Sequence, residues 1–146
     1  MIAYLDASAL VKRYIVEQGS KETIALTAES EITASSILSR AEVAAALAKA
    51  VRIGLVTQEV ARSAQRMFVR DWPDLVRVPV TEALVERAEG LAWEHGLRGY
   101  DSVQFASALT WQESVGEGIV LATFDQRLWE AAKRMGLTAW PEPFPA

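Results

Sequence analysis

Short apolar runs alternate with longer amphipathic segments along the whole chain. Residues 2–5 form the compact apolar run that a buried strand shows, whereas 37–53 spaces its apolar residues at helical intervals. The same reading predicts strands over 2–5, 32–34, 75–80, 119–123 and 137–140. It predicts helices over 9–17, 20–28, 37–53, 57–71, 81–94, from about 101 to the turn at 116–118, and over 125–136, with an irregular tail at 141–146.

Strands and helices therefore alternate from end to end, which is typical of an α/β protein. Helical crossovers make neighbouring strands parallel and cover both faces of the sheet. We expect a three-layer α/β/α domain with a mainly parallel central sheet of about five strands. No internal repeat, linker or low-complexity segment interrupts residues 1–146, so one domain is expected over the whole length.

Turn and cap residues support these helix limits. Ser20, Thr57 and Thr81 stand where N-caps are expected. Gly54 and Gly96 follow the ends of two predicted helices, where glycine is the usual terminator.

The composition restricts the chemistry that is open to the chain. There is no cysteine and only one histidine, which excludes a disulfide framework, a thiolate zinc site and a multi-histidine metal site. A metal would need oxygen ligands, which favour hard cations such as Mg²⁺ or Mn²⁺. The first residues do not resemble a signal peptide and no apolar stretch is long enough to cross a bilayer, so we expect a cytoplasmic protein with no membrane partner.

The formal net charge of −4 gives no overall basic footprint for nucleic acid. Divalent ions held by converging carboxylates would offset that charge. A local basic rim would then still hold phosphates.

Two aspartates follow predicted strands closely. Asp6 comes directly after 2–5, and Asp125 follows 119–123 after one further residue. The carboxyl ends of parallel strands open into one crevice, so both side chains are expected there. Asp101 and Glu42 belong to predicted helices that can lean over the same end of the sheet, so a four-carboxylate site is expected.

Each of these acids also has a simpler explanation. Asp6, Asp101 and Asp125 stand where helices begin, and aspartate is a favoured N-cap. Asp101 has Gln104 three residues later, which is the spacing of a capping box. Glu42 is equally a solvated helix residue, although positions 38, 39, 45 and 46 offer it no basic partner.

Taken together, four segments resemble the motifs of the PIN-domain family, and in particular the VapC-type toxins of bacterial and archaeal toxin–antitoxin pairs. They are YLDAS at 4–8, SRAEV at 39–43, LRGYDS at 97–102 followed by FASAL at 105–109, and TFD at 123–125. The resemblance covers nearly the whole chain. It departs from many relatives at Ser102 and Gln104, where alanine and histidine are common.

The resemblance implies a Mg²⁺- or Mn²⁺-dependent endoribonuclease that hydrolyses RNA phosphodiester bonds. The residues that match the family's acidic cluster, for metal binding and catalysis, are Asp6, Glu42, Asp101 and Asp125. Ser8 and Thr123 would be supporting hydroxyls. As a toxin, the protein would be a homodimer bound by a VapB-like antitoxin, which typically brings a segment, often with an arginine, near the acidic pocket.

Three basic residues are candidates for contact with RNA. Arg98 precedes Asp101 by three residues, while Lys12 and Arg13 follow the first acidic motif. Each is equally explained as a solvated side chain, and Arg98 also as the partner of a salt bridge to the acids.

Three other functions fit parts of the pattern. A PIN domain can act in RNA processing rather than as a toxin, and one that has lost activity can be an interaction module. An aspartyl-phosphate phosphotransfer domain also places aspartates at strand ends. The haloacid-dehalogenase type requires a second aspartate at position 8, where this chain has serine, and a receiver requires adjacent acids near its first strand.

Overall fold

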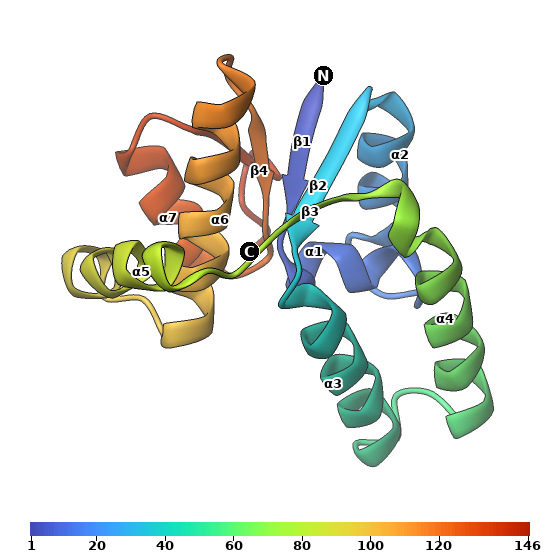
Figure 1. Cartoon of the computed structure of the whole chain (residues 1–146). Coiled ribbons are helices and arrows are strands. Elements are labelled where there is room, and N and C mark those ends of the chain that lie inside the picture. The colour runs from blue at the N-terminus through green and yellow to red at the C-terminus, as the bar shows by residue number, and fades with distance from the viewer.

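A five-stranded sheet forms the centre of the computed structural model, which describes residues 1–146, and helices cover both of its faces (Figure 1). The strands are β1 Ile2–Leu5, β2 Ile32–Ser36, β3 Val76–Val78, β4 Val120–Ala122 and β5 Thr138–Trp140. Their order is β3-β2-β1-β4-β5, and each neighbouring pair is parallel. The expected three-layer α/β/α class and the number of strands are confirmed.

Seven helices and two 3₁₀ turns connect the strands. They are α1 Ala7–Leu10, η1 Val11–Arg13, α2 Ser20–Glu29, α3 Ser39–Arg52, α4 Gln58–Asp71, η2 Trp72–Asp74, α5 Glu82–His95, α6 Gly99–Val115 and α7 Gln126–Arg134. None of the helices combines the length and apolar character that crossing a membrane requires.

Two buried clusters lie on opposite faces of the sheet. Tyr4 of β1 faces α5, α6 and α7, where it joins Phe105 in one cluster. Leu5 points the other way and joins Leu10 and Phe68 of the cluster under α1 to α4. Because successive residues of a strand point to opposite faces, the short apolar β1 supplies both cores, and this explains its lack of polar residues.

The sheet has a topological switch point at its centre. From β1 the chain builds outward through β2 and β3, and it then returns to place β4 on the other side of β1. Leu5 is in register with Ala122, so β1 and β4 end side by side. Parallel α/β sheets bind ligands beyond the strand ends at such a point.

The predicted helix over 9–17 is wrong in its limits. The structure has only the α-helical turn α1 and the 3₁₀ turn η1, which together end at Arg13. The Ser20 hydroxyl bonds the Ile15 carbonyl at 2.8 Å and accepts from the Glu17 N–H at 3.0 Å, which stabilises a turn instead of a continued helix. Ser20 is therefore the first residue of α2 rather than its cap, and Gly19, at φ +90°, takes the cap position.

Candidate active site

All four predicted acids line one pocket of about 160 Å³ beyond the ends of β1 and β4. Asp6 directly follows β1, and Glu42 lies in the first turn of α3. Asp101 lies in the first turn of α6, and Asp125 is the N-cap of α7. Residues from four separate segments are thus brought together at the switch point.

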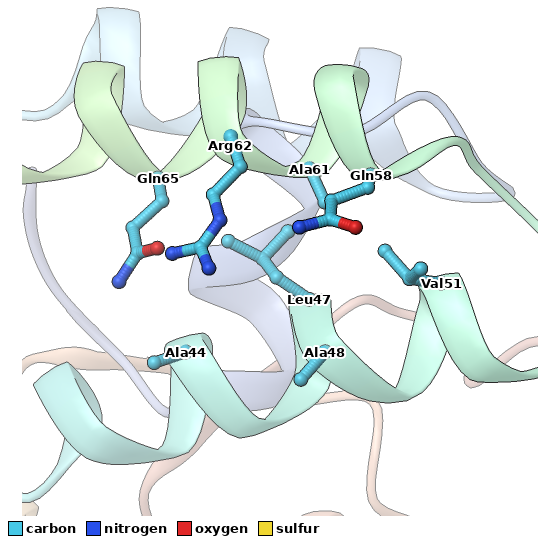
Figure 2. A pocket seen from close by; sticks show the side chains of 8 residues that line it. All are labelled: Ala44, Leu47, Ala48, Val51, Gln58, Ala61, Arg62 and Gln65. Atoms are coloured by element: carbon cyan, nitrogen blue, oxygen red, sulfur yellow. The ribbon is translucent and has the colours of Figure 1, made fainter.

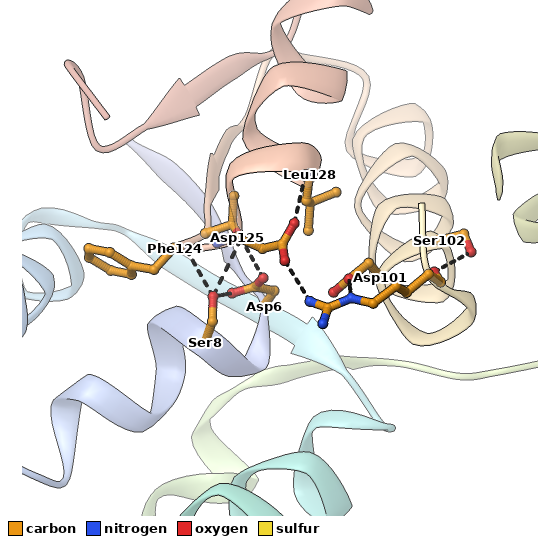
Figure 3. A network of polar contacts seen from close by, with 9 residues as sticks. Asp6, Ser8, Asp101, Ser102, Phe124, Asp125 and Leu128 are labelled. Atoms are coloured by element: carbon orange, nitrogen blue, oxygen red, sulfur yellow. Dashed lines mark hydrogen bonds and ion pairs between the residues drawn. The ribbon is translucent and has the colours of Figure 1, made fainter. Parts of the chain in front are cut away.

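Asp6 lies at the floor of this pocket and is almost fully buried. Its Oδ1 accepts from the Ser8 hydroxyl at 2.7 Å, and its Oδ2 accepts from the Thr123 hydroxyl at 2.5 Å (Figure 3). Oδ1 also accepts from the Ala9 N–H at 3.0 Å. Burial raises the pKa of the Asp6 carboxyl to about 7, and the bonds from Thr123 and Ser8 oppose that rise. This carboxylate is held firmly but is not neutralised by any cation of the protein.

The two hydroxyls also connect β1 to β4. Ser8 accepts from the Phe124 N–H at 2.8 Å, and Thr123 accepts from the Asp125 N–H at 3.0 Å. Each hydroxyl therefore receives a backbone donor from the β4 end while donating to Asp6. This arrangement fixes the orientation of Asp6 relative to the start of α7.

The pKa of Asp6 has a consequence for stability. In the unfolded chain this carboxyl titrates near its ordinary value of 3.8, whereas in the folded protein it titrates near 7, so the folded state holds the proton more tightly. The free energy of unfolding should therefore fall as the pH rises from about 4 to about 7, by about 1.4 kcal/mol per unit of pKa difference. Urea unfolding in the presence of EDTA at pH 5 and at pH 8 measures this decrease in the free energy of unfolding.

The pKa values of Glu42 and Asp101 are also raised, chiefly by burial, and contribute with the same sign. The decrease in the free energy of unfolding with rising pH should be smaller in Asp6→Asn. It should be unchanged in the exposed Asp74→Asn. Equal stability of the wild type at both pH values would contradict the prediction.

The two carboxylate oxygens of Asp125 make different contacts. Oδ1 accepts from the Leu128 N–H at 2.9 Å and so caps α7, as its position after a strand predicts. Oδ2 accepts from Arg98 Nη2 at 2.7 Å (Figure 3). The capping interpretation is correct for this residue, yet it leaves one oxygen for the pocket.

The expected cap at Asp101 is wrong. Helix α6 begins at Gly99, so its N-cap is Arg98, and no side chain caps it. Asp101 therefore stands inside the first turn, where Arg98 Nε donates to its Oδ2 at 2.9 Å. Burial raises the pKa of Asp101, against the effect of Arg98. Asp101 therefore faces the pocket and, as an acid in the first turn, suits the dipole of α6, but it does not cap the helix.

Gln104 does not belong to a capping box either; it holds Glu42. Its Nε2 donates to Glu42 Oε1 at 2.6 Å and to Ser39 Oγ at 2.9 Å, and its Oε1 accepts from the Tyr4 hydroxyl at 2.6 Å. Gln104 is only 1% exposed, so all of these bonds are buried or partly buried. No local pattern in the sequence indicated this role, because Tyr4, Ser39 and Glu42 come from other elements than Gln104.

The other two basic candidates make their contacts with residues of their own neighbourhood. Lys12 Nζ pairs with Glu17 at 3.0 Å, donates to the Gln18 carbonyl at 2.7 Å and lies 4.4 Å from the centre of the Phe124 ring. Arg13 lies against Tyr14. Neither lines the pocket, whereas Arg98 does.

The donor set fits a hard divalent ion that keeps part of its water shell. No three Asp, Glu or His side chains are placed so that they could hold a metal ion together. Mg²⁺ usually takes only one or two carboxylates and retains several waters, so three protein ligands are not required. The pocket of about 160 Å³ has room for the ion and some of those waters, since one water takes up about 30 Å³.

A second hollow, of about 330 Å³, lies between α3 and α4, away from the acids (Figure 2). Leu47 and Val51 of α3 face Ala61 of α4, and Arg62 with Gln65 lies at one side. It contains no carboxylate, so it offers no chemistry for a metal.

The fold and the site together make this an α/β protein with an acidic pocket at the switch point of a parallel sheet. A model of the PIN domain family matches residues 3–134. The chain therefore belongs to the PIN-domain family.

Two curated relatives match over nearly their full length. Ribonuclease VapC45 from Mycobacterium tuberculosis (strain CDC 1551 / Oshkosh) is 38% identical over 141 residues, covering 96% of this chain and 95% of that protein. Ribonuclease VapC49 from Mycobacterium tuberculosis (strain ATCC 25618 / H37Rv) has the same identity and coverage. The chain is thus similar to VapC-type members of the family.

Solved structures show the same fold. PAE2754 from Pyrobaculum aerophilum superposes with a TM-score of 0.65 at 25% identity, over 95% of this chain and 83% of that one. FitAcB from Neisseria gonorrhoeae gives 0.62 at 16% identity, over 97% of both chains. A toxin–antitoxin complex from Klebsiella pneumoniae superposes with a TM-score of 0.54 at 18% identity, over 81% of this chain and 83% of that one.

Proposed function

We propose that this chain is an endoribonuclease that acts as the toxin of a VapBC-type toxin–antitoxin pair, with the whole chain as one nuclease domain. The observation that carries the proposal is the gathering of four carboxylates from four segments into one pocket. The chain shares 38% identity with proteins named ribonuclease VapC, which supports the choice of RNA as substrate.

Asp6 and Asp101 are proposed as direct ligands of Mg²⁺ or Mn²⁺, with Glu42 and Asp125 bound directly or through water. When bound, the ion supplies a nucleophilic water at neutral pH and neutralises charge on the phosphoryl oxygens. Ser8 and Thr123 orient Asp6 through its two oxygens.

Glu42 is the residue best placed to hold a proton during hydrolysis. Gln104 fixes its Oε1, while Oε2 has no hydrogen-bond partner in the protein. Burial raises the pKa of this carboxyl, which makes it a stronger base than an exposed glutamate. We propose that Oε2 accepts a proton from the attacking water.

Divalent metal should raise the melting temperature, because it relieves repulsion among the gathered carboxylates. The gain should be smaller in Asp101→Asn and unchanged in the exposed Asp74→Asn. Thermal unfolding with Mn²⁺ and with EDTA measures it. A wild-type melting temperature that does not respond to Mg²⁺ or Mn²⁺ would argue against a metal site.

The proposed partners are a VapB-like antitoxin and a second copy of this chain. The toxin–antitoxin complex from Klebsiella pneumoniae has the same fold as this chain. That likeness in fold is what it contributes to the proposal of an antitoxin partner. A small antitoxin reading frame beside the gene, together with toxicity on expression that the antitoxin relieves, would separate a toxin from a PIN nuclease of RNA processing.

The test of the activity is RNA cleavage by the purified protein with Mn²⁺ and with EDTA. Cleavage at defined sites that EDTA abolishes supports the proposal. No cleavage of transfer, ribosomal or messenger RNA in the presence of metal would leave the interaction-module alternative as the better one.

A further inference from the structure

Arg98 closes the mouth of the acidic pocket. Its Nε donates to Asp101 Oδ2 at 2.9 Å and its Nη2 donates to Asp125 Oδ2 at 2.7 Å (Figure 3). One guanidinium thus joins two of the four carboxylates, which come from the beginnings of two different helices. No other basic side chain lines the pocket.

The oxygen that Arg98 takes from Asp125 is the one that a metal would need. Asp125 Oδ1 caps α7 through the Leu128 N–H, so Oδ2 is the oxygen that has no bond to the backbone. A divalent ion that binds Oδ2 must share that oxygen with Arg98 or replace it. The charge of the guanidinium also repels a cation held by Asp101.

The exposure of Arg98 allows its ion pair with Asp125 to open. The Arg98 side chain is 56% exposed, whereas those of Asp101 and Asp125 are 8% and 19% exposed. An ion pair with one partner in water contributes little net free energy, so a divalent ion can compete with it. The guanidinium also lies 4.8 Å from the centre of the Tyr100 ring, which offers it a second favourable contact when it leaves Asp125.

We propose that Arg98 is a resident counter-ion of the acidic pocket, which pairs with Asp125 when no divalent ion is bound and releases it when an ion enters. The proposal rests on the proposed function, because it requires the pocket to bind a divalent ion. It assigns to Arg98 a role in setting the metal affinity of the protein.

The test is the affinity of the full-length protein for Mn²⁺ without RNA, measured by isothermal titration calorimetry. The variants are Arg98→Gln, Arg98→Lys and, as a matched control, Arg87→Gln. Arg87 pairs with Glu113 between α5 and α6, so its substitution removes the same charge from an arginine–carboxylate pair outside the pocket. Circular dichroism of each variant checks that it is folded.

Arg98→Gln should bind Mn²⁺ roughly fivefold more tightly than the wild type, since it removes an exposed competing ion pair. Arg98→Lys should lie between the two, because a single ammonium does not reproduce the two-point contact of the guanidinium. Arg87→Gln should match the wild type. Without metal, Arg98→Gln should melt at a lower temperature than the wild type and gain more from Mn²⁺.

The outcomes separate this proposal from the proposed function. Binding of Mn²⁺ with one affinity in wild type, Arg98→Gln and Arg87→Gln would overturn the role of Arg98 while leaving a metal-dependent nuclease intact. Weaker binding in Arg98→Gln would also overturn it and would make Arg98 an organiser of the carboxylates. No binding in any protein would remove the metal site itself.

Discussion

Asp6→Asn is expected to lower metal-dependent RNA cleavage by roughly 100-fold or more while the protein stays folded. Asparagine keeps the shape of the side chain and an oxygen that can accept from Ser8 and the Ala9 N–H. It removes the negative charge at the floor of the pocket, where no cation of the protein compensates it. Initial rates on a labelled RNA, measured with Mn²⁺, give the effect.

The matched control is Asp71→Asn. Asp71 is a half-buried aspartate that also accepts from a hydroxyl, that of Tyr14 at 3.1 Å, but it does not line the pocket. Its substitution should leave the rate within about twofold, since surface changes away from a site have small effects. Undiminished cleavage by folded Asp6→Asn would exclude Asp6 from the reaction, and an equal loss in both variants would attribute the loss to stability.

The gathering of the acids was predictable because it follows from strand order and not from side-chain detail. Asp6 and Asp125 each follow a buried strand, and parallel neighbours end at one edge of the sheet. The sequence left capping and pocket binding as alternatives for these two residues. The structure shows that they are compatible, because a carboxylate has two oxygens: Asp125 caps α7 with Oδ1 and faces the pocket with Oδ2.

The interactions that complete the pocket were not predictable, because they depend on how separate elements lie against each other. Gln104 bonds Tyr4 across 100 positions of the sequence, and no local pattern encodes such a pair. The Arg98 contact to Asp125 similarly requires the positions of two helix starts and a side-chain rotamer. At Gln104, local spacing predicted a capping box instead. At Arg98, a salt bridge to the acids was one of the alternatives, and the structure confirms it and shows which two acids it joins.

The second acidic position depends on a buried network rather than on Glu42 alone. Tyr4 comes from the central strand, Gln104 from α6, and Ser39 with Glu42 from α3. Ser35 of β2 adds a bond to Ser39 at 2.7 Å. The network therefore couples the orientation of Glu42 to the packing of α6 on the sheet.

Gln104→Leu is accordingly expected to lower both stability and activity. It leaves the buried Tyr4 hydroxyl without its 2.6 Å acceptor and removes the Nε2 donor from Ser39 and Glu42. A buried polar group without its partner typically costs about 1–3 kcal/mol, which in a domain of this size lowers the melting temperature by roughly 5 °C. Cleavage should fall by about tenfold, as expected when a residue that orients a catalytic carboxylate is lost.

Two further variants distinguish loss of the network from loss of a glutamine. Gln104→His should recover most of the melting temperature and rate, because an imidazole can accept from Tyr4 at one nitrogen and donate to Glu42 at the other. Gln58→Leu, at an exposed position in the first turn of α4, should leave both quantities near wild type. If Gln104→Leu lowers the melting temperature but cleaves RNA at the wild-type rate, the network only stabilises the fold and Glu42 does not need its Gln104 bond for catalysis.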